Sequence, residues 1–109
     1  MRYIEIDKSS IPYKFDITLA GDTFTFYVNY NTQGDFFTID LYKNDEAVVL
    51  GEKLVYGRQL FLSYQYRDTP KIPIVPLDMA GNTDRITFEN MNKDVFLFLI
   101  DGDDNEVLD

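Results

Sequence analysis

The sequence predicts an all-β protein, either a small antiparallel β-sandwich or a partly closed β-barrel of about 7–9 short strands. Apolar and polar residues alternate with a period of two along much of the chain, and turn signals recur about every 8–12 residues. A chain of 109 residues is also the size of one domain. We therefore assign residues 1–101 to a single β domain and residues 102–109 to an acidic, mobile C-terminal tail.

The first two strands form the clearest hairpin. "YKFDITLA" at 13–20 and "TFTFYVNY" at 23–30 both alternate apolar with polar residues. Gly21 and Asp22 lie between them, a pair that is typical of a tight β-turn.

Two more strands continue this meander. "NTQG" at 31–34 supplies a second turn, with Gly34 at its end, and "DFFTIDLY" follows at 35–42. A third turn, "KNDE", leads into "AVVL" at 47–50. We expect residues 13–50 to form a four-stranded antiparallel sheet.

Two glycines frame the next stretch, "LGEKLVYGRQLF" at 50–61. Glycine inside a strand pattern indicates a bulge, a bend or a close approach of other groups to the backbone. We interpret Gly51 as a bulge or corner from which the strand continues through "KLVYG", and Gly57 as its end. The alternative is a ligand lying against the glycine backbone.

Residues 58–71, "RQLFLSYQYRDTPK", fit neither a helical nor a strand pattern. We predict an irregular excursion with one or two helical turns that exposes aromatic side chains. Exposed aromatic residues are typical of interfaces. Four residues of the excursion are therefore candidate partner contacts: Leu60, Phe61, Tyr64 and Tyr66.

Three further extended segments complete the domain. "IPIVPLDM" at 72–79 contains Pro73 and Pro76, which cannot donate ladder hydrogen bonds and so predict an edge or bulged strand. A turn containing Gly81 follows. "RITFEN" at 85–90 and "DVFLFLID" at 94–101 are predicted strands.

The charge excludes several classes of partner. The 19 acidic and 10 basic residues give a net charge of −9. This balance argues against nucleic-acid binding and against an anionic membrane surface, both of which require clustered Lys and Arg. The first ten residues, "MRYIEIDKSS", contain no apolar run, so no signal peptide is predicted.

Catalytic chemistry is poorly supported, and we expect neither enzymatic activity nor a cofactor. The chain contains no Cys and no His. Asp101, Asp103 and Asn105 have the spacing that begins a calcium loop, but Glu106 stands where that loop needs glycine, so a solvated tail is favoured. A hydrolytic carboxylate pair would have to come from acids at outward strand positions or in turns: Asp16, Asp40, Glu46, Glu52, Asp78 and Glu89.

An aromatic strip is the remaining candidate site. Tyr27, Phe36 and Tyr42 point outward from adjacent predicted strands. Such a strip could stack against a carbohydrate or host-surface receptor, or could pack under the excursion at 58–71 or against a neighbouring subunit. We favour packing against protein.

The order of these segments resembles the family of small phage baseplate plug proteins. The resemblance lies in "FDITLAGDTFTFYVNYNTQGDFFTIDLY", then "GEKLVYGRQLF", then "IPIVPLDMAGNTDRITFENMNKDVFLFLI". It implies a non-enzymatic structural protein of the virion tail baseplate, made in the bacterial host cytoplasm and packed against hub, tail-tube or spike proteins. Self-association in the assembly stays open. We treat the turn and bulge glycines as fold-defining: Gly21, Gly34, Gly51, Gly57 and Gly81.

Overall fold

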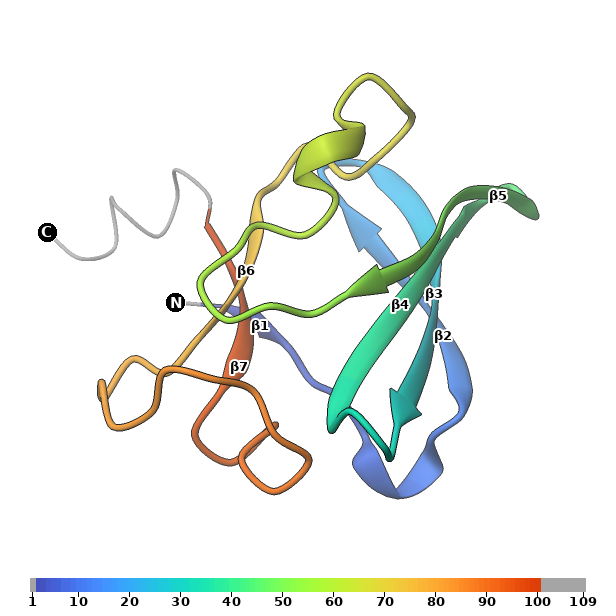
Figure 1. The fold of residues 1–109 in the computed structure, drawn as a ribbon. Coiled ribbons are helices and arrows are strands. Elements are labelled where there is room, and N and C mark those ends of the chain that lie inside the picture. The colour runs from blue at the N-terminus through green and yellow to red at the C-terminus, as the bar shows by residue number, and fades with distance from the viewer. Residues whose placement is uncertain (1, 101–109) are drawn as a thin grey trace, which may run out of the picture.

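The computed structural model describes residues 2–100 as seven β-strands in two antiparallel sheets (Figure 1). The sheets do not close into a barrel. Their arrangement confirms the predicted all-β class and is compatible with a sandwich. The predicted tail and its calcium-like spacing lie outside the described residues.

The larger sheet has the order β2-β3-β4-β5, so each strand pairs with its neighbour in sequence. Its strands are β2 (Tyr13–Leu19), β3 (Asp22–Asn31), β4 (Phe36–Lys43) and β5 (Glu46–Lys53). This sheet confirms the meander predicted for residues 13–50, and β5 continues past Gly51 as far as Lys53.

The smaller sheet has the order β1-β7-β6 and consists of β1 (Tyr3–Ile4), β6 (Ile74–Leu77) and β7 (Phe96–Leu99). β6 contains Pro76 and lies at an edge, as the two prolines predicted. The two-residue β1 was not predicted, because so short a segment shows no alternation. It depends on pairing with β7, far along the chain.

The core lies between the two sheets. Phe26 and Phe61 meet in it edge to face, with ring centroids 6.1 Å apart. The larger sheet supplies inward side chains from all four strands: Leu19, Phe24, Phe26, Val28, Phe37, Ile39, Leu41 and Val49. The smaller sheet and the loops supply the opposing layer: Ile4, Ile6, Leu54, Leu60, Phe61, Ile74, Ile86, Met91, Val95, Leu97 and Leu99.

The segment after β5 closes one side of the sandwich. The backbone N–H of Leu54 donates to the carbonyl of Phe37 in the larger sheet at 2.9 Å. The N–H groups of Gly57 and Leu60 donate to the carbonyls of Pro76 and Ile74 in β6, each at 2.8 Å. The strand predicted through "KLVYG" is therefore wrong beyond Lys53: the chain leaves the larger sheet and covers the edge of the smaller one.

The strand predicted at 85–90 is also wrong. Asn90 binds this segment into a turn: its side-chain oxygen accepts from the N–H of Thr87 at 2.8 Å, and its amide donates to the carbonyl of Arg85 at 2.9 Å. Thr87 returns the interaction, since its hydroxyl accepts from the N–H of Asn90 at 3.1 Å. Local side-chain bonds of this kind compete with sheet pairing.

Helical structure is confined to two short 3₁₀ turns among residues 2–100, η1 (Lys8–Ser10) and η2 (Leu62–Tyr64). Asp7 caps η1 by accepting hydrogen bonds from Ser9 and Ser10, and these bonds lower the pKa of its carboxyl group. In the part of the chain that is described, no helix is long and apolar enough to cross a membrane.

Candidate assembly surface

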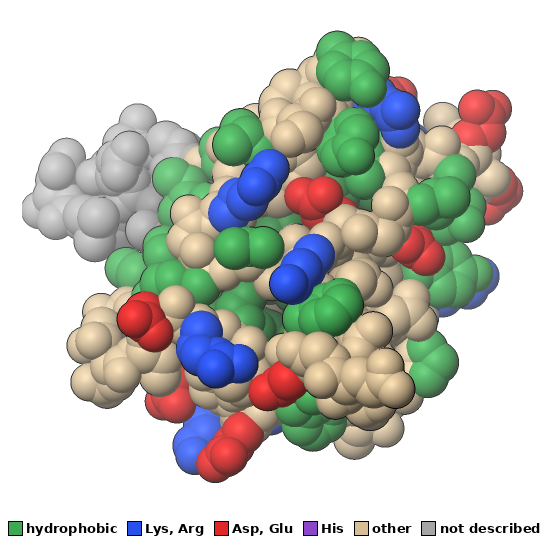
Figure 2. Space-filling model, viewed as in Figure 1, with side chains coloured by type: hydrophobic (Ala, Val, Ile, Leu, Met, Phe, Trp, Pro, Cys, Tyr) green, Lys and Arg blue, Asp and Glu red, His purple; other side chains and the backbone are tan. Residues whose placement is uncertain are grey.

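The excursion after Arg58 presents an exposed aromatic arm, which we define as Tyr64, Tyr66 and Arg67. Tyr66 is 77% exposed. The Arg67 guanidinium lies 5.0 Å from the Tyr64 ring centroid and 5.5 Å from that of Tyr66. Figure 2 shows apolar side chains with a basic group beside them at the top of the molecule, where η2 lies in Figure 1. The two tyrosine rings of the arm are therefore positioned by cation–π contacts with the same Arg67 side chain.

Leu60 and Phe61 do not belong to this exposed arm, contrary to the sequence-based expectation. Phe61 is only 1% exposed, and its ring contacts Phe26 in the core. Its N–H donates to the Glu52 carboxylate at 2.7 Å. Leu60 is also buried. The excursion is thus anchored by its first apolar residues and exposed only beyond them, a division that its irregular pattern did not reveal.

The predicted strip on the larger sheet is only partly assembled. Tyr27 and Tyr42 contact each other edge to face, with centroids 5.4 Å apart and planes at 61°. Phe36 lies further along the β3–β4 pair, opposite Asn31, and stacks beneath the Lys53 ammonium at 4.6 Å. The two tyrosines form a notch rather than the flat platform that sugar stacking would use.

A third surface was not predicted from the sequence: the outward side of the smaller sheet. Cross-strand partners share a face in an antiparallel pair. Phe98 pairs with Tyr3 on one side and Val75 on the other, and Phe96 pairs with Leu77. The residues that alternate with them along each strand, such as Leu97 and Ile74, face the core instead.

We call these five residues the apolar outer face: Tyr3, Val75, Leu77, Phe96 and Phe98. Its three rings form one cluster, with centroids 4.6 Å apart for Tyr3 and Phe96, 6.0 Å for Tyr3 and Phe98, and 6.1 Å for Phe96 and Phe98. Tyr3 is 46% exposed, Val75, Leu77 and Phe96 are partly buried, and Phe98 is only 7% exposed. Adjacent to β6, Met79 is exposed as well. Every outward position of this sheet is thus apolar.

A signal for this face was present in the sequence. The "FLFL" run of β7 is apolar at every position, whereas a strand with one solvated face alternates. β3 and β4 do alternate, and their outward positions carry mostly Thr, Asn and Asp. Continuous apolarity in β7 therefore indicated that both of its faces are covered or are available to be covered.

Four of the six acids proposed as hydrolytic candidates have structural partners. Asp40 accepts from the N–H of Gly51, Glu52 from the N–H of Phe61, and Asp16 from the hydroxyl of Thr25. None of these contacts brings two carboxylates together. Within residues 2–100, no group of three or more acidic side chains is placed to hold a metal ion.

Asp78 is the most fully engaged of these acids. Burial raises the pKa of its carboxyl group, but hydrogen bonds from Ala80, Asn82 and Thr83 outweigh burial, so the pKa lies below its usual value. The four bonds fold the residues after β6 into a turn around the carboxylate. Asp78 is therefore a turn-organising group.

The fold and these surfaces define a small all-β structural domain with apolar contact surfaces. Comparison with protein-family models matches residues 1–103 to the family described as cyanophage baseplate Pam3 plug gp18. The chain belongs to this family of phage baseplate plugs, which confirms the resemblance noted in the sequence. It is accordingly a structural component of a phage tail baseplate. A search of curated proteins returned no match.

Proposed function

We propose that the protein acts as a plug-like, non-enzymatic subunit that packs against hub or tail-tube proteins near the tail tip, with the apolar outer face as its main contact. Family membership supports the baseplate role. The single structural observation that carries the contact is the all-apolar outward side of the smaller sheet, with its cluster of three rings.

The physical reason is the cost of leaving such a face in water. Contiguous exposed apolar patches on small proteins mark interaction sites, and aromatic side chains contribute much of the binding energy at interfaces. Hydrophobic burial does not depend on charge, so a chain with a net charge of −9 can use this face with partners of either sign.

The aromatic arm supplies a second contact in this proposal. Tyr66 protrudes near η2 beside the half-buried Tyr64, while the notch of Tyr27 and Tyr42 and the ring of Phe36 line the outward side of the larger sheet. The three surfaces lie on different elements, so one subunit can contact more than one neighbour. This is what an internal part of an assembly requires.

Size-exclusion chromatography with light scattering tests the proposal on the full chain mixed with hub-like and tube-like proteins encoded beside it. The test variant is Tyr3→Ser with Val75→Thr, which makes the apolar outer face polar without removing a core residue. Tyr27→Ser is the matched control on the larger sheet. Circular dichroism establishes that each variant is folded.

We expect the wild-type chain to form a complex with a hub or tube protein, and the Tyr3/Val75 variant to lose it while Tyr27→Ser retains it. A complex that survives the Tyr3/Val75 change but not Tyr27→Ser would move the contact to the larger sheet. A wild-type chain that binds none of these proteins would overturn the proposed partners.

A further inference from the structure

One long edge of the larger sheet has no pairing strand among residues 2–100. β2 pairs with β3 on one side only, through seven consecutive residue pairs without a register shift. β2 contains no proline and no bulge, which are two of the devices that protect free edges. The opposite side of the sandwich, by contrast, is closed by the segment after β5.

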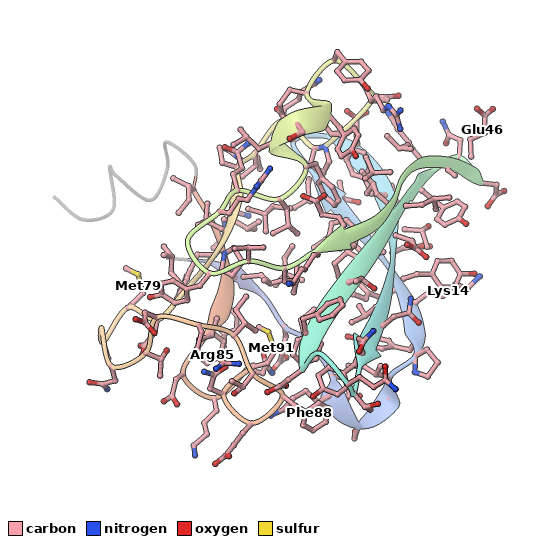
Figure 3. The ribbon with its side chains drawn as sticks, viewed as in Figure 1. Lys14, Glu46, Met79, Arg85, Phe88 and Met91 are labelled. Carbon is pink, nitrogen blue, oxygen red and sulfur yellow. The ribbon has the colours of Figure 1, made fainter. Side chains whose placement is uncertain are left out.

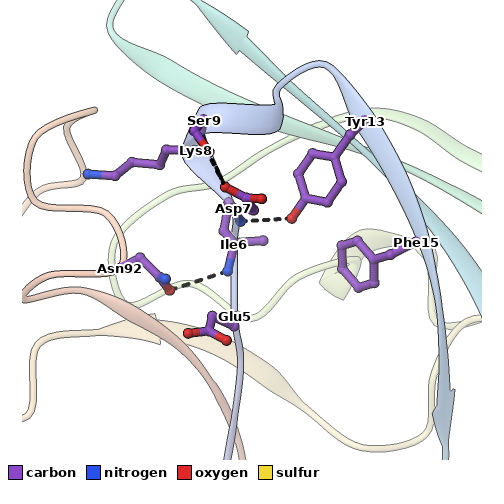
Figure 4. A pocket seen from close by; sticks show the side chains of 8 residues that line it. All are labelled: Glu5, Ile6, Asp7, Lys8, Ser9, Tyr13, Phe15 and Asn92. Carbon is purple, nitrogen blue, oxygen red and sulfur yellow. Dashed lines mark hydrogen bonds between the residues drawn. The ribbon is translucent and has the colours of Figure 1, made fainter.

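The free edge borders an open cleft. A cavity of about 710 Å³ lies between β2 and the N-terminal segment at residues 5–9, and Tyr13 and Phe15 line it from the β2 side (Figure 4). The Tyr13 hydroxyl accepts a hydrogen bond from the N–H of Asp7 at 2.9 Å across it. The Phe15 ring is only half-buried, although it points inward and lies 5.5 Å from the Phe26 ring centroid. The inward side chains at this end of β2 are therefore only partly covered by the rest of the chain.

The outward residues of β2 have a self-complementary order. Lys14 and Asp16 flank Phe15 and point to the solvent side of the sheet. Figure 3 shows Lys14 projecting from the body of the molecule. In an antiparallel pair of two β2 strands centred on Phe15, Lys14 of each copy lies opposite Asp16 of the other. Opposite charges at directly opposed positions stabilise a pair of strands.

The inward residues match in the same register. Phe15 lies opposite Phe15 of the second copy, and Tyr13 lies opposite Ile17. Each of these side chains is half-buried in the single chain. Pairing would place the second copy's rings beside the cleft that Tyr13 and Phe15 line.

Neighbouring registers are less favourable. Centring the pair on Asp16 opposes two like charges, which is destabilising. Centring it on Ile17 places Asp16 opposite Thr18 and leaves Lys14 opposite Ala20, so both ion pairs are lost. A shift by a single residue would turn the apolar side of one copy to the solvent face of the other.

We propose that two copies of this chain pair through β2, antiparallel and centred on Phe15, to form a continuous eight-stranded sheet. The occupant of the free edge is a second copy because the charges and the apolar residues of β2 complement themselves in one register. This inference does not depend on which baseplate protein contacts the apolar outer face.

Charge exchange on β2 tests the pairing. Lys14→Asp and Asp16→Lys each replace two attractions with two repulsions, while the double variant restores two attractions with reversed signs. Lys71→Asp and Glu46→Lys are controls with the same change of net charge at exposed positions away from β2. Sedimentation equilibrium on the full chain at physiological salt measures the dimer dissociation constant.

We expect a dimer for the wild type, and roughly tenfold or greater weakening in each single β2 variant. The double variant should regain most of the wild-type affinity, and the two controls should stay close to wild type. Asp16→Lys is the sharpest variant, because it lowers the net negative charge and would strengthen any dimer limited only by general repulsion.

Hydrogen exchange on the same samples locates the contact, since pairing should slow exchange at alternate amides of β2 in proportion to the dimer fraction. A wild-type monomer at all concentrations would overturn the proposal. A dimer unaffected by the single variants, or not rescued by the double variant, would overturn it as well. Failure of the hub and tube mixtures would leave this result unchanged.

Discussion

The backbone N–H of Gly51 donates to the Oδ1 atom of Asp40 at 2.7 Å, across the β4–β5 pair. β4 advances two residues from Ile39 to Leu41 while β5 passes three, from Glu52 to Val49, so β5 carries one extra residue here. Gly51 has φ of +70° at this bulge. A side chain on one strand thus satisfies the amide that the bulge removes from the ladder.

Replacing Asp40 with Ala should destabilise the protein, because the Gly51 amide loses its acceptor. We expect a decrease of about 1 kcal/mol in the free energy of unfolding. Asp40→Asn is the matched control: it keeps an acceptor oxygen and should cost less than Asp40→Ala. Urea denaturation measures both. Equal losses in the two variants would show that the hydrogen bond is not the cause.

Gly51→Ala examines the same bulge through its backbone. Apart from Gly51 and its two chain neighbours, no atom lies within 4 Å of the position that an added Cβ would occupy, so the methyl group meets no steric obstacle from the rest of the fold. The positive φ alone should cost about 1–2 kcal/mol. A neutral substitution in urea denaturation would mean that β5 can adopt another conformation at this point.

The excursion should divide into a buried anchor and an exposed arm when it is mutated. Phe61→Ala removes a side chain that is 1% exposed, and should lower the free energy of unfolding by about 3–5 kcal/mol. Tyr66→Ala should change it by no more than about 0.5 kcal/mol, because Tyr66 is largely exposed. Similar losses for both variants, measured by urea denaturation, would contradict this division.

The parts of this fold that could be predicted from the sequence are those that depend on local residue patterns. The larger sheet is a meander whose first two turns contain Gly21 and Gly34 and whose third contains Asn44 and Asp45, so residues adjacent in sequence carry most of the signal. β1 is different: it is defined by pairing with β7, and its two residues carry no period of their own. Long-range pairing of this kind leaves little trace in a single sequence.

The candidate contact surfaces follow the same distinction. The exposure of Tyr66 could be anticipated, whereas the burial of Phe61 depends on Glu52 and Phe26, which only the folded chain brings near. The apolar outer face requires knowing that β1 and β6 flank β7. Its residues were visible in the sequence, but their common face was not.

Asn90 should be essential to the turn that replaces the strand expected at 85–90. Asn90→Ala leaves the Thr87 N–H and the Arg85 carbonyl without their partner, and Asn90 is buried. We expect a loss of about 1–3 kcal/mol in the free energy of unfolding. Asn90→Asp keeps the acceptor for the Thr87 N–H but removes the donor to the Arg85 carbonyl. The decrease in its free energy of unfolding therefore measures the contribution of the hydrogen bond to Arg85. A neutral Asn90→Ala variant would contradict the turn's dependence on this side chain.

The stability of the protein should fall in acid, and Asp78 should account for a measurable share. The pKa of its carboxyl group lies below the ordinary value for Asp, because the hydrogen bonds from Ala80, Asn82 and Thr83 outweigh burial and favour the charged form. A lowered pKa in the folded state means that the unfolded chain binds the proton more readily. Its contribution is therefore complete at neutral pH and is lost as pH falls below about 4, through the folded pKa.

Asp78→Asn isolates this contribution. Asp7 and Asp35 also have lowered pKa values, so the wild type and the variant should both lose stability in acid. The difference between them belongs to Asp78, and it should be largest at pH 7 and shrink toward pH 3. Urea midpoints measured across this range give the difference directly. If the difference in stability between the wild type and Asp78→Asn stays constant with pH, the charge of the Asp78 carboxylate does not stabilise the protein. The turn after β6 would then be stabilised by packing instead.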